Sequence, residues 1–382
     1  MPQLLVNPAS GGREAMAHLF PLLPFIADET PMSWAARQAA FHTTGRLLPF
    51  LNDLKIPVGD LVRGQAEAVI QLCDKAGADP APVLHNTISA IGGRRYRLRH
   101  LEFAAEFTTG PDMRFCPLCL REDNAEGRPF GVMMRHRLSW CLTPVRTCGG
   151  HNLELQAHRE GKWDDHVRDL RRLSEADQGH VRDGEMALQQ RNISPLQAYL
   201  EGRLVQRGGP DWLDCQDIDQ AIRAAEMLGG LAMFGVEQSA SAMTQNMWDE
   251  AGRVAWPIVS GGEAAIRAFL IDQIRLTSGK RGPFNPAGAF GMLYRWLSAS
   301  RLTKDPGPIR AILRDAIVEA TPVNIGQNIL GVNIAEPRLT TLASIAKTSR
   351  MHKVTLLNVL HVAGLVSDAE KGNPIVNYGE VC

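Results

Sequence analysis

The sequence has no excess of charge of either sign, because its 41 lysines and arginines are balanced by 41 aspartates and glutamates. There is therefore no overall attraction toward nucleic acid, and any contact with it must come from local patches or be shared with partners. Aromatic residues are also scarce, at 6%, although the hydrophobic fraction of 45% is that of a globular protein. At 382 residues the chain is long enough for two to four domains.

Long apolar runs are missing as well. No segment reaches the roughly 18 apolar residues of a membrane span, and the stretch LFPLLPFI is short and broken by prolines. The first residues, MPQLLVNPASGG, lack the basic segment, apolar run and cleavage site of a signal peptide. We therefore expect a cytoplasmic protein that makes no membrane contact.

Signatures of enzymes are lacking too. There is no Walker A motif, which excludes the common type of ATPase, and the carboxylates show no spacing that singles out a DDE nuclease. The segment VNPASGG resembles the phosphate-binding opening of lipid kinases, but no Gly-Gly pair in the chain continues into the Gly-Gly-Asp-Gly that those kinases need. We expect a protein that is not an enzyme.

Helical periodicity is abundant, and it predicts a mainly α fold. In PIRAILRDAIVEA, Pro308 suits a first helical turn and the apolar residues from Ile309 to Ala320 recur on one face. Alternating strand patterns are scarce, and HNLELQAH is the best short candidate. The pattern predicts a multi-domain helical protein with helix-turn-helix units and an inserted small zinc-ribbon-like domain. Its predicted domains are residues 1–112 (helical, helix-turn-helix), 113–157 (zinc-binding), 158–333 (helical) and 334–382 (helix-turn-helix).

Four of the seven cysteines gather in one segment, whereas Cys73, Cys215 and Cys382 are isolated. In a reducing compartment such a cluster indicates a metal site more often than disulfides. The two knuckles are Cys116-Pro-Leu-Cys119 and Cys148-Gly-Gly-His151. Three sulfurs and one nitrogen would close a tetrahedron around a structural zinc ion.

Some details of this zinc site are open from the sequence. The spacer between the knuckles is longer than in the commonest zinc ribbons, so His136 or Cys141 are alternatives to His151 as the fourth ligand. A packing or hydrogen-bonding role is the more ordinary reading of His136. The two glycines of the second knuckle are expected to supply the positive φ that such turns often require.

The C-terminal stretch TLASIAKTSRMHKVTLLNVLHVAGL is typical of a helix-turn-helix. Its first helix would run from Thr341 to Lys347, with Ala346 at the crossing point, and its turn would cover residues 349–351. Arg350 stands where glycine is usual. The second helix would turn Leu356, Val359 and Leu360 inward. It would present to DNA four outward residues, His352, Lys353, Thr355 and Asn358. A helical hairpin that contacts only protein is the alternative.

An earlier stretch, VIQLCDKAGADPAPVLHNTI, has the same helix-turn-helix spacing of small and apolar residues. Cys73 takes the small crossing position, Gly77 the turn and Val83 the inward anchor. GGRRYRLRH follows, and its alternating arginines beside an aromatic residue are suited to gripping a phosphate backbone, with a solvated charge run as the alternative. The candidate DNA-binding arginines are Arg94, Arg95, Arg97 and Arg99.

Taken together, these motifs resemble the TniQ family of transposition proteins, also called the TnsD/TniQ family. The resemblance begins at DETPMSW, continues through RFCPLCLRED and closes with Cys148, His151 and Leu153. Later segments, FGMLYRWL and the helix from Pro308, resemble the family's later helical part. The family usually has proline after the third cysteine and glycine after the histidine, where this chain has Gly149 and Asn152.

The resemblance implies a target-selection adaptor and not a transposase. Such a protein links a target, which is either a DNA site or a CRISPR effector complex, to the AAA+ ATPase that recruits the transposase. Members associated with CRISPR effectors can act as dimers, so the resemblance also allows a homodimer. A stand-alone zinc-containing helix-turn-helix transcriptional regulator is the alternative, and such a regulator should bind a defined operator tightly by itself.

Overall fold

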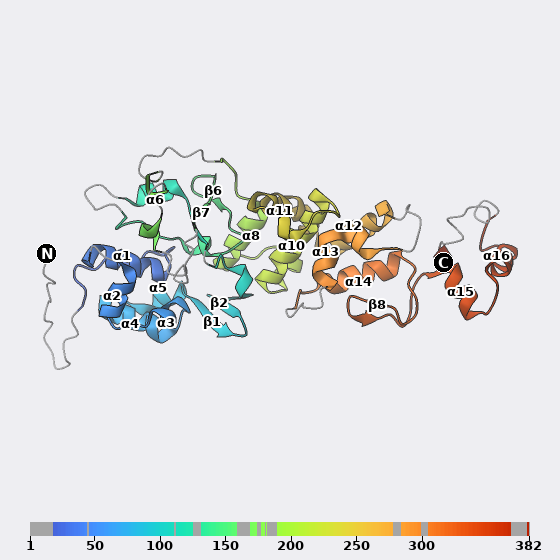
Figure 1. Cartoon of the computed structure of the whole chain (residues 1–382), viewed down its shortest axis with the longest axis horizontal. Helices are drawn as coiled ribbons and strands as arrows, with labels where there is room; N and C mark the ends of the chain where they lie inside the picture. The colour runs from blue at the N-terminus through green and yellow to red at the C-terminus, as the bar shows by residue number, and fades with distance from the viewer. Residues whose placement is uncertain are drawn as a thin grey trace. The chain divides into compact units, whose positions relative to one another are not determined.

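The computed structural model describes most of the chain. The described residues are 18–43, 46–110, 112–124, 131–158, 169–173, 177–179, 181, 189–277, 284–298, 305–367 and 380–381. The segment VNPASGG, most of the polar stretch 158–172 and Cys382 lie outside them. The described chain is mainly helical with small antiparallel sheets, as the periodicity predicted (Figure 1).

The chain divides into two compact units, Met1–Arg207 and Gly208–Cys382. The boundaries of the four predicted domains stay predictions. The helices of the first unit are α1 (Pro31–Thr43), α2 (Leu47–Asp53), α3 (Val58–Val62), α4 (Ala66–Ala76), α5 (Pro80–His85), α6 (Pro117–Asp123) and α8 (Pro195–Leu204). Its strands are β1 (Ile88–Gly92), β2 (Arg95–Leu98), β3 (Leu101–Ala104), β4 (Met113–Phe115), β5 (Thr147–Cys148), β6 (Leu153–Glu154) and β7 (Gln156–His158).

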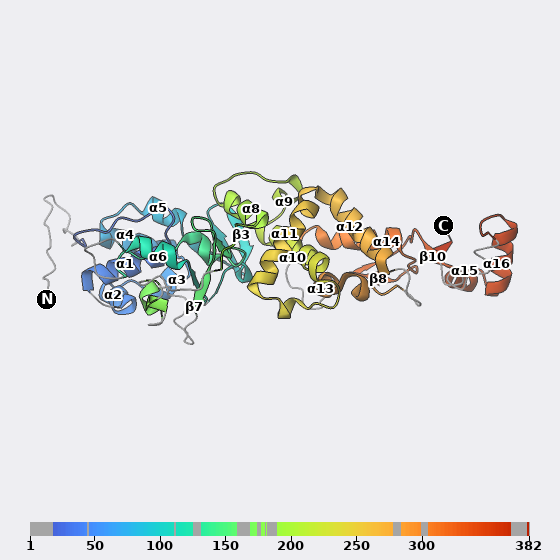
Figure 2. The ribbon, with the colours of Figure 1, turned by 90° about the horizontal axis from the view of Figure 1, so that it is seen from above.

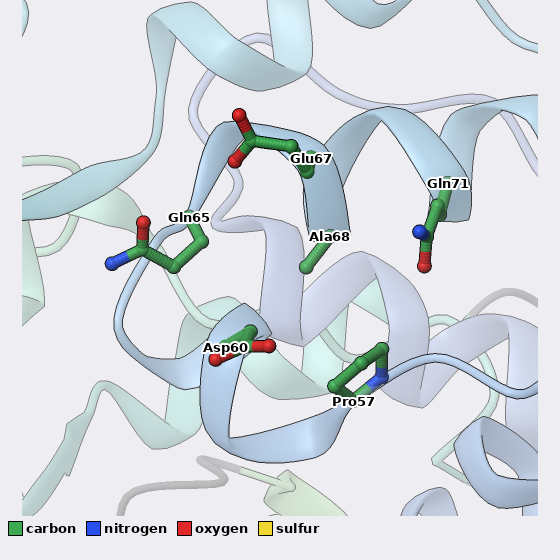
Figure 3. Close-up of a pocket in the computed structure, with 6 residues that line it drawn as sticks. All are labelled: Pro57, Asp60, Gln65, Glu67, Ala68 and Gln71. Atoms are coloured by element: carbon green, nitrogen blue, oxygen red, sulfur yellow. The ribbon is translucent and has the colours of Figure 1, made fainter.

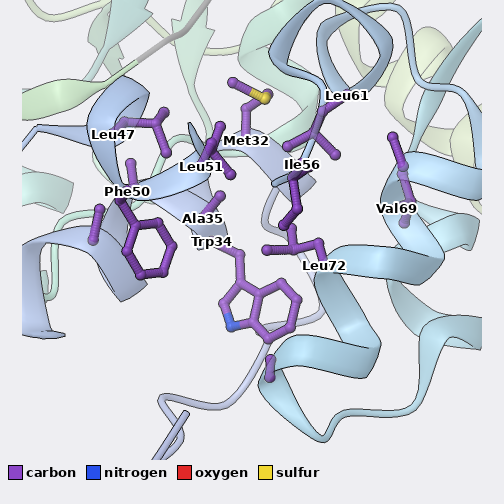
Figure 4. Packing of buried hydrophobic residues seen from close by; sticks show 14 of the residues in the cluster. Met32, Trp34, Ala35, Leu47, Phe50, Leu51, Ile56, Leu61, Val69 and Leu72 are labelled. Carbon is purple, nitrogen blue, oxygen red and sulfur yellow. The ribbon is translucent and has the colours of Figure 1, made fainter. Parts of the chain in front are cut away.

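Helices α1 to α5 share one hydrophobic core. Trp34 is fully buried at its centre, and its indole N–H donates to the Leu23 carbonyl at 2.8 Å. Leu51, Ile56 and Leu72 converge on the same region (Figure 4). The predicted crossing residue Cys73 and anchor Val83 are both fully buried, which confirms the predicted packing of α4 on α5.

The predicted turn between α4 and α5 is also present. Gly77 has φ +69, its N–H donates to the Asp74 carbonyl, and the N–H of Ala78 donates to the Cys73 carbonyl. These two bonds form a Schellman motif, in which a left-handed residue ends the helix and satisfies its last carbonyls.

Three small sheets complete the first unit. Strands β1, β2 and β3 form an antiparallel meander, which the sequence patterns did not predict. The predicted strand HNLELQAH is instead two short strands with different partners, because β6 pairs with β5 and β7 pairs with β4. These last two pairings bring the cysteine knuckles together.

The second unit begins with packed helices that lie side by side in both views (Figures 1 and 2). They are α9 (Asp211–Asp214), α10 (Ile218–Phe234), α11 (Gln245–Ser260), α12 (Gly262–Thr277), α13 (Pro286–Ser298) and α14 (Ile309–Ala320). Helix α14 buries Ile309, Ile312, Leu313, Ala316 and Ile317, so its predicted apolar face is confirmed. Within the described residues no single helix is long and apolar enough to cross a membrane, although α11 and α12, bent by 116° at their junction, pass together on length and composition.

The rest of the second unit is built from short elements. A hairpin of β8 (Asn328–Ile329) and β9 (Val332–Asn333) precedes β10 (Thr340–Thr341), which pairs with β11 (Glu380–Val381). Helices α15 (Leu342–Thr348) and α16 (Lys353–Val362) follow β10. They have a small core of their own, made of Leu342, Ala346, Leu356, Leu357 and Val366.

Candidate metal centre and nucleic-acid surfaces

The first cysteine knuckle is a strand-to-helix junction. Strand β4 leads into Cys116, which is the N-terminal cap of α6, and Pro117 begins the helix. The Leu120 N–H donates to the Cys116 carbonyl at 3.1 Å, which closes the first helical turn. Cys116 and Cys119 are three residues apart on this turn, so their side chains lie on the same face.

The second knuckle is the turn between β5 and β6. Cys148 ends β5, and the Asn152 N–H donates to its carbonyl at 2.8 Å. The expectation of positive φ at the knuckle glycines is wrong, because the residue with positive φ is Asn152, at +52. Asparagine tolerates this conformation better than most residues. Gly149 lies close to Ile193, because a Cβ at position 149 would lie 2.8 Å from the end of the Ile193 side chain, which would have to shift.

The four predicted ligands come together in one cluster. Their ligand atoms all lie within 4.8 Å of one another. The Sγ atoms of Cys119 and Cys148 are 3.5 Å apart, and the His151 Nδ1 lies 3.6, 3.3 and 3.6 Å from the sulfurs of Cys116, Cys119 and Cys148. A tetrahedral zinc ion would set its ligand sulfurs about 3.8 Å apart, with about 3.6 Å from sulfur to nitrogen. The cluster could therefore hold a metal ion.

The close packing of the three thiols and the imidazole shifts the pKa values of these groups. Hydrogen bonding with Cys116 and Cys148 raises the pKa of the Cys119 thiol, whereas hydrogen bonds from Cys116 and Cys119 lower the pKa of Cys148. Burial alone would lower the pKa of His151, but the hydrogen bonds to Glu122 and Cys148 outweigh it and raise that pKa. A metal cation would favour the thiolate and neutral imidazole forms, since these are the forms that bind metal.

Glu122 supports the histidine from the side away from the cysteines. Its Oε1 lies 2.9 Å from the His151 Nε2, so that nitrogen can carry the proton while Nδ1 faces the sulfurs. A carboxylate that holds a ligating histidine in this way fixes its ring orientation and tautomer. Glu122 was not among the predicted site residues, although its position three residues after Cys119, on the same short helix, was a usable signal.

The two alternative ligands pair with each other and lie outside the cluster. His136 Nδ1 is 3.7 Å from the Cys141 Sγ, and the His136 ring packs edge-on against Trp140 with centroids 5.7 Å apart. Neither residue belongs to the group of four among the described residues. The ordinary interpretation of His136, as a packing and hydrogen-bonding residue, is confirmed.

Residues distant in the sequence hold the metal segment in place. Buried Gln197 of α8 accepts hydrogen bonds from the backbone N–H groups of Arg146 and Thr147 at 3.0 and 3.1 Å, and donates to the Thr147 carbonyl at 2.7 Å. On the other side, the Ser33 hydroxyl of α1 accepts from the His136 N–H at 2.8 Å. The strand that delivers Cys148 is therefore fixed from beyond the predicted zinc domain.

The motif DETPMSW explains the contact with α1. Glu29 and Arg37 are both buried, and the guanidinium donates to the two carboxylate oxygens at 2.7 and 2.6 Å. The Ser33 hydroxyl also donates to Glu29, at 2.9 Å. Burial raises the pKa of Glu29 despite this pairing with Arg37. The motif therefore supplies Glu29 to a buried ion pair, and Arg37 comes from the next turn of α1.

The four candidate arginines lie on and beside strand β2. Arg94 and Arg97 are exposed, but each pairs with a carboxylate, at 3.1 Å to Glu106 and 2.6 Å to Glu102. Arg95 lies on β2 and is half-buried. Arg97 and Glu102 lie opposite each other on the paired strands β2 and β3.

Arg99 differs from the other three arginines. Its guanidinium donates at 2.8 Å to both the Leu204 carbonyl and the Asn86 amide oxygen. Burial lowers the pKa of Arg99. These bonds tie the meander to α8 and α5.

The C-terminal helix pair follows the predicted pattern closely. Helix α15 begins one residue later than predicted, Ala346 is buried, and Arg350 in the turn has φ +54. All four predicted outward residues are exposed: His352, Lys353, Thr355 and Asn358. The inward position of Val359 is wrong, since that side chain is 50% exposed and Leu357 is buried instead.

One surface pocket of about 320 Å³ lies at the junction of α3 and α4 (Figure 3). It is lined by Pro57, Asp60, Gln65, Glu67, Ala68 and Gln71. Asp60 pairs with Arg63 at 2.5 Å. The lining contains no predicted site residue.

The fold and the cluster define the class of protein: it is mainly helical and has a Cys3His cluster suited to a structural metal ion. Comparison with protein families then identifies the domain. Residues 21–155 match the model of the TniQ family, so the chain contains a TniQ family domain, and all four cluster residues lie inside it. A comparison with curated proteins finds no match. TniQ proteins are generally non-catalytic transposition factors, and the domain implies a role in transposition target selection.

Proposed function

We propose that this chain is a non-catalytic adaptor that links a transposition target to the AAA+ ATPase and transposase of a mobile element. The match of residues 21–155 to the TniQ family carries the proposal. The cluster geometry supports a scaffold and not a reaction centre, because four protein ligands leave no open coordination position on a tetrahedral ion. The proposed location of the adaptor is the cytoplasm.

The metal in this proposal is zinc, held by Cys116, Cys119, Cys148 and His151. Three sulfurs and one imidazole nitrogen form a donor set typical of structural zinc. The ion stabilises the segment between β4 and β7, and Glu122 orients the histidine. When bound, it supplies folding free energy and no chemistry.

The DNA contact in this proposal lies at α15 and α16, which act as a helix-turn-helix. Residues 338–367 contain four basic residues, Arg338, Lys347, Arg350 and Lys353, and no aspartate or glutamate. The chain as a whole is neutral, so this segment is a local basic patch of the kind that attracts phosphates. The arginines of the β2 region, Arg94, Arg95, Arg97 and Arg99, are a second and weaker candidate, because two of them are neutralised by neighbouring carboxylates.

A tagged chain captured from its native host would test the proposal. Mass spectrometry of the captured proteins should find an AAA+ ATPase, and sequencing of the captured nucleic acid should find DNA beside transposon insertions. A CRISPR effector complex with its guide RNA, or a second copy of this chain, would identify the branch of the family. Recovery of promoter DNA alone would instead favour a stand-alone transcriptional regulator and would contradict the adaptor.

A further inference from the structure

Helix α16 has an outward face of unusual composition. Thr355, Asn358, Val359 and Val362 follow the i, i+3, i+4, i+7 spacing that places residues on one side of a helix. All four are exposed, with Val359 at 50% and Val362 at 87%. The opposite side packs on α15 through Leu356, Leu357 and Leu360. The outward face therefore presents methyl groups, the Thr355 hydroxyl and one amide to solvent.

Neither helix propensity nor solubility explains why valine and threonine occupy these exposed positions. Valine and threonine lose side-chain freedom in a helix, and exposed positions usually favour lysine, glutamate or arginine. Val354 is exposed as well, at 60%. A short helix with several exposed β-branched residues and no acidic residue is more simply explained by a surface that meets a partner.

The basic residues around this face favour a polyanion as its binding partner. Lys347 stands at the end of α15 and Arg350 in the turn, and Lys353 begins α16. Residues 338–367 include no aspartate or glutamate, and Glu380 of β11 pairs with Thr341 at the opposite end of α15 from this turn. Cations at the rim and uncharged groups on the helix face match a DNA major groove, where phosphates border the base edges.

The side chains of the face also select among base pairs. An asparagine amide, with one donor and one acceptor group, pairs with the N6 and N7 edge of adenine, and aliphatic methyl groups contact the thymine methyl. The face has no arginine or lysine to bind guanine and no carboxylate to accept from cytosine. Its chemistry therefore matches A·T pairs.

We propose that the outward face of α16 reads consecutive A·T base pairs in the major groove, with Asn358 on adenine and Thr355, Val359 and Val362 on thymine methyl groups. This inference rests on the proposed DNA contact of α15 and α16. It adds the base composition of the target, which neither the charge pattern nor the TniQ domain assigns.

Selection from a random DNA pool with the full-length chain gives the first test. The enriched sequences should share a short A·T run, and Asn358→Ala should reduce the preference for adenine at one position by about 5- to 150-fold. Enrichment of a site without adjacent A·T pairs would overturn the inference while leaving the DNA contact intact. Failure to bind any DNA at low salt would overturn both, and would assign the face to a protein partner.

Two modified probes separate the contacts within the selected site. Uracil in place of thymine removes only the methyl group and should weaken binding about threefold to fivefold per contacted methyl. Val362→Ala should reduce this sensitivity at one thymine position and leave it at the positions contacted by Thr355 and Val359. The base 7-deazaadenine removes the N7 acceptor and should weaken the wild-type chain but not Asn358→Ala. Val332→Ala, which changes a 43% exposed valine on β9, is the matched control and should retain both responses. Equal affinity for thymine and uracil probes would refute the methyl contacts.

Discussion

The β2 region and the C-terminal helix pair both contain clustered basic residues, yet their charges are arranged in opposite ways. Around β2, Arg94 and Arg97 each face a carboxylate of the same sheet region. Along α15 and α16 the sequence supplies no carboxylate side chain between residues 338 and 367. A run of arginines is therefore not by itself a basic patch, because carboxylates of the same sheet region can neutralise it.

The two regions also differ in how they are stabilised. The first lies in a unit that contains the Cys3His cluster and the buried Glu29–Arg37 pair, whereas the helix pair has only a small apolar core. Changes to the cluster or to the ion pair should therefore affect the first region and spare the second. The largest effect is expected at the metal cluster and the smallest at the turn between α15 and α16.

Removal of the metal ligands should produce the largest difference in stability between the two regions. Cys116→Ser combined with Cys119→Ser should eliminate about one zinc ion per chain and unfold the segment around it, since such sites contribute about 10–16 kcal/mol of apparent binding free energy. Elemental analysis would measure the metal, and hydrogen exchange should find α15 and α16 unchanged. Cys215→Ser, at an exposed cysteine, should retain the metal. Full metal retention in the double variant would refute the ligand assignment.

Breaking the buried ion pair should have the next largest effect. Arg37→Ala leaves Glu29 buried without its partner and should lower the free energy of unfolding of the first unit by about 3–5 kcal/mol. Urea denaturation would measure the change. The control is Arg63→Ala, because Arg63 pairs with Asp60 at an exposed site and should cost about 1 kcal/mol or less. Similar losses for the two variants would show that the buried pair is not important for stability.

Loss of the carboxylate behind His151 should weaken metal binding without abolishing it. Glu122→Ala should lower the metal affinity about 10- to 100-fold, because the imidazole loses the hydrogen bond that orients it. Glu122→Gln keeps an acceptor oxygen and should recover part of the loss. Competition with a chelating dye would measure these affinities, with the exposed Glu67→Ala as a control. An unchanged affinity in Glu122→Ala would remove this residue from the site.

Charge removal should distinguish the two basic regions in DNA binding. Lys353→Ala should reduce the slope of log affinity against log salt by about one, since one phosphate contact is lost. Arg97→Ala should leave that slope nearly unchanged, because its partner Glu102 already neutralises it. Fluorescence anisotropy over a salt series would measure both variants. The reverse result would transfer the DNA contact to β2.

The smallest effect concerns the turn between α15 and α16. Arg350 ends α15 in a Schellman motif, in which its N–H donates to Lys347 and the N–H of Met351 donates to Ala346. Because a left-handed conformation costs a residue with a Cβ roughly 1–2 kcal/mol, Arg350→Gly should stabilise the helix pair by about 0.5–1 kcal/mol while weakening DNA binding. Gly364→Ala should do the opposite to stability, since Gly364 ends α16 with φ +73. Hydrogen exchange within the pair would measure both changes.

Features that depend on short spacings were predictable. The two knuckles and the Schellman turns at Gly77 and Arg350 are set by residues within a few positions of one another. Val359 was assigned to the wrong face, because the phase of a short helix depends on where its neighbour covers it. The β1–β3 meander was missed because the strands are largely half-buried or exposed and lack a clear alternation of apolar and polar residues.

The sequence by itself determined the two knuckles, Cys116–Cys119 and Cys148–His151, and the segment 338–367 without aspartate or glutamate, because each depends only on residues near one another along the chain. Only the tertiary structure decided that Gln197 and Ser33 hold the metal segment, and that Arg99 binds Leu204 instead of facing solvent. These contacts join residues far apart in the sequence. Their partners depend on how helices and strands pack, which no local spacing encodes.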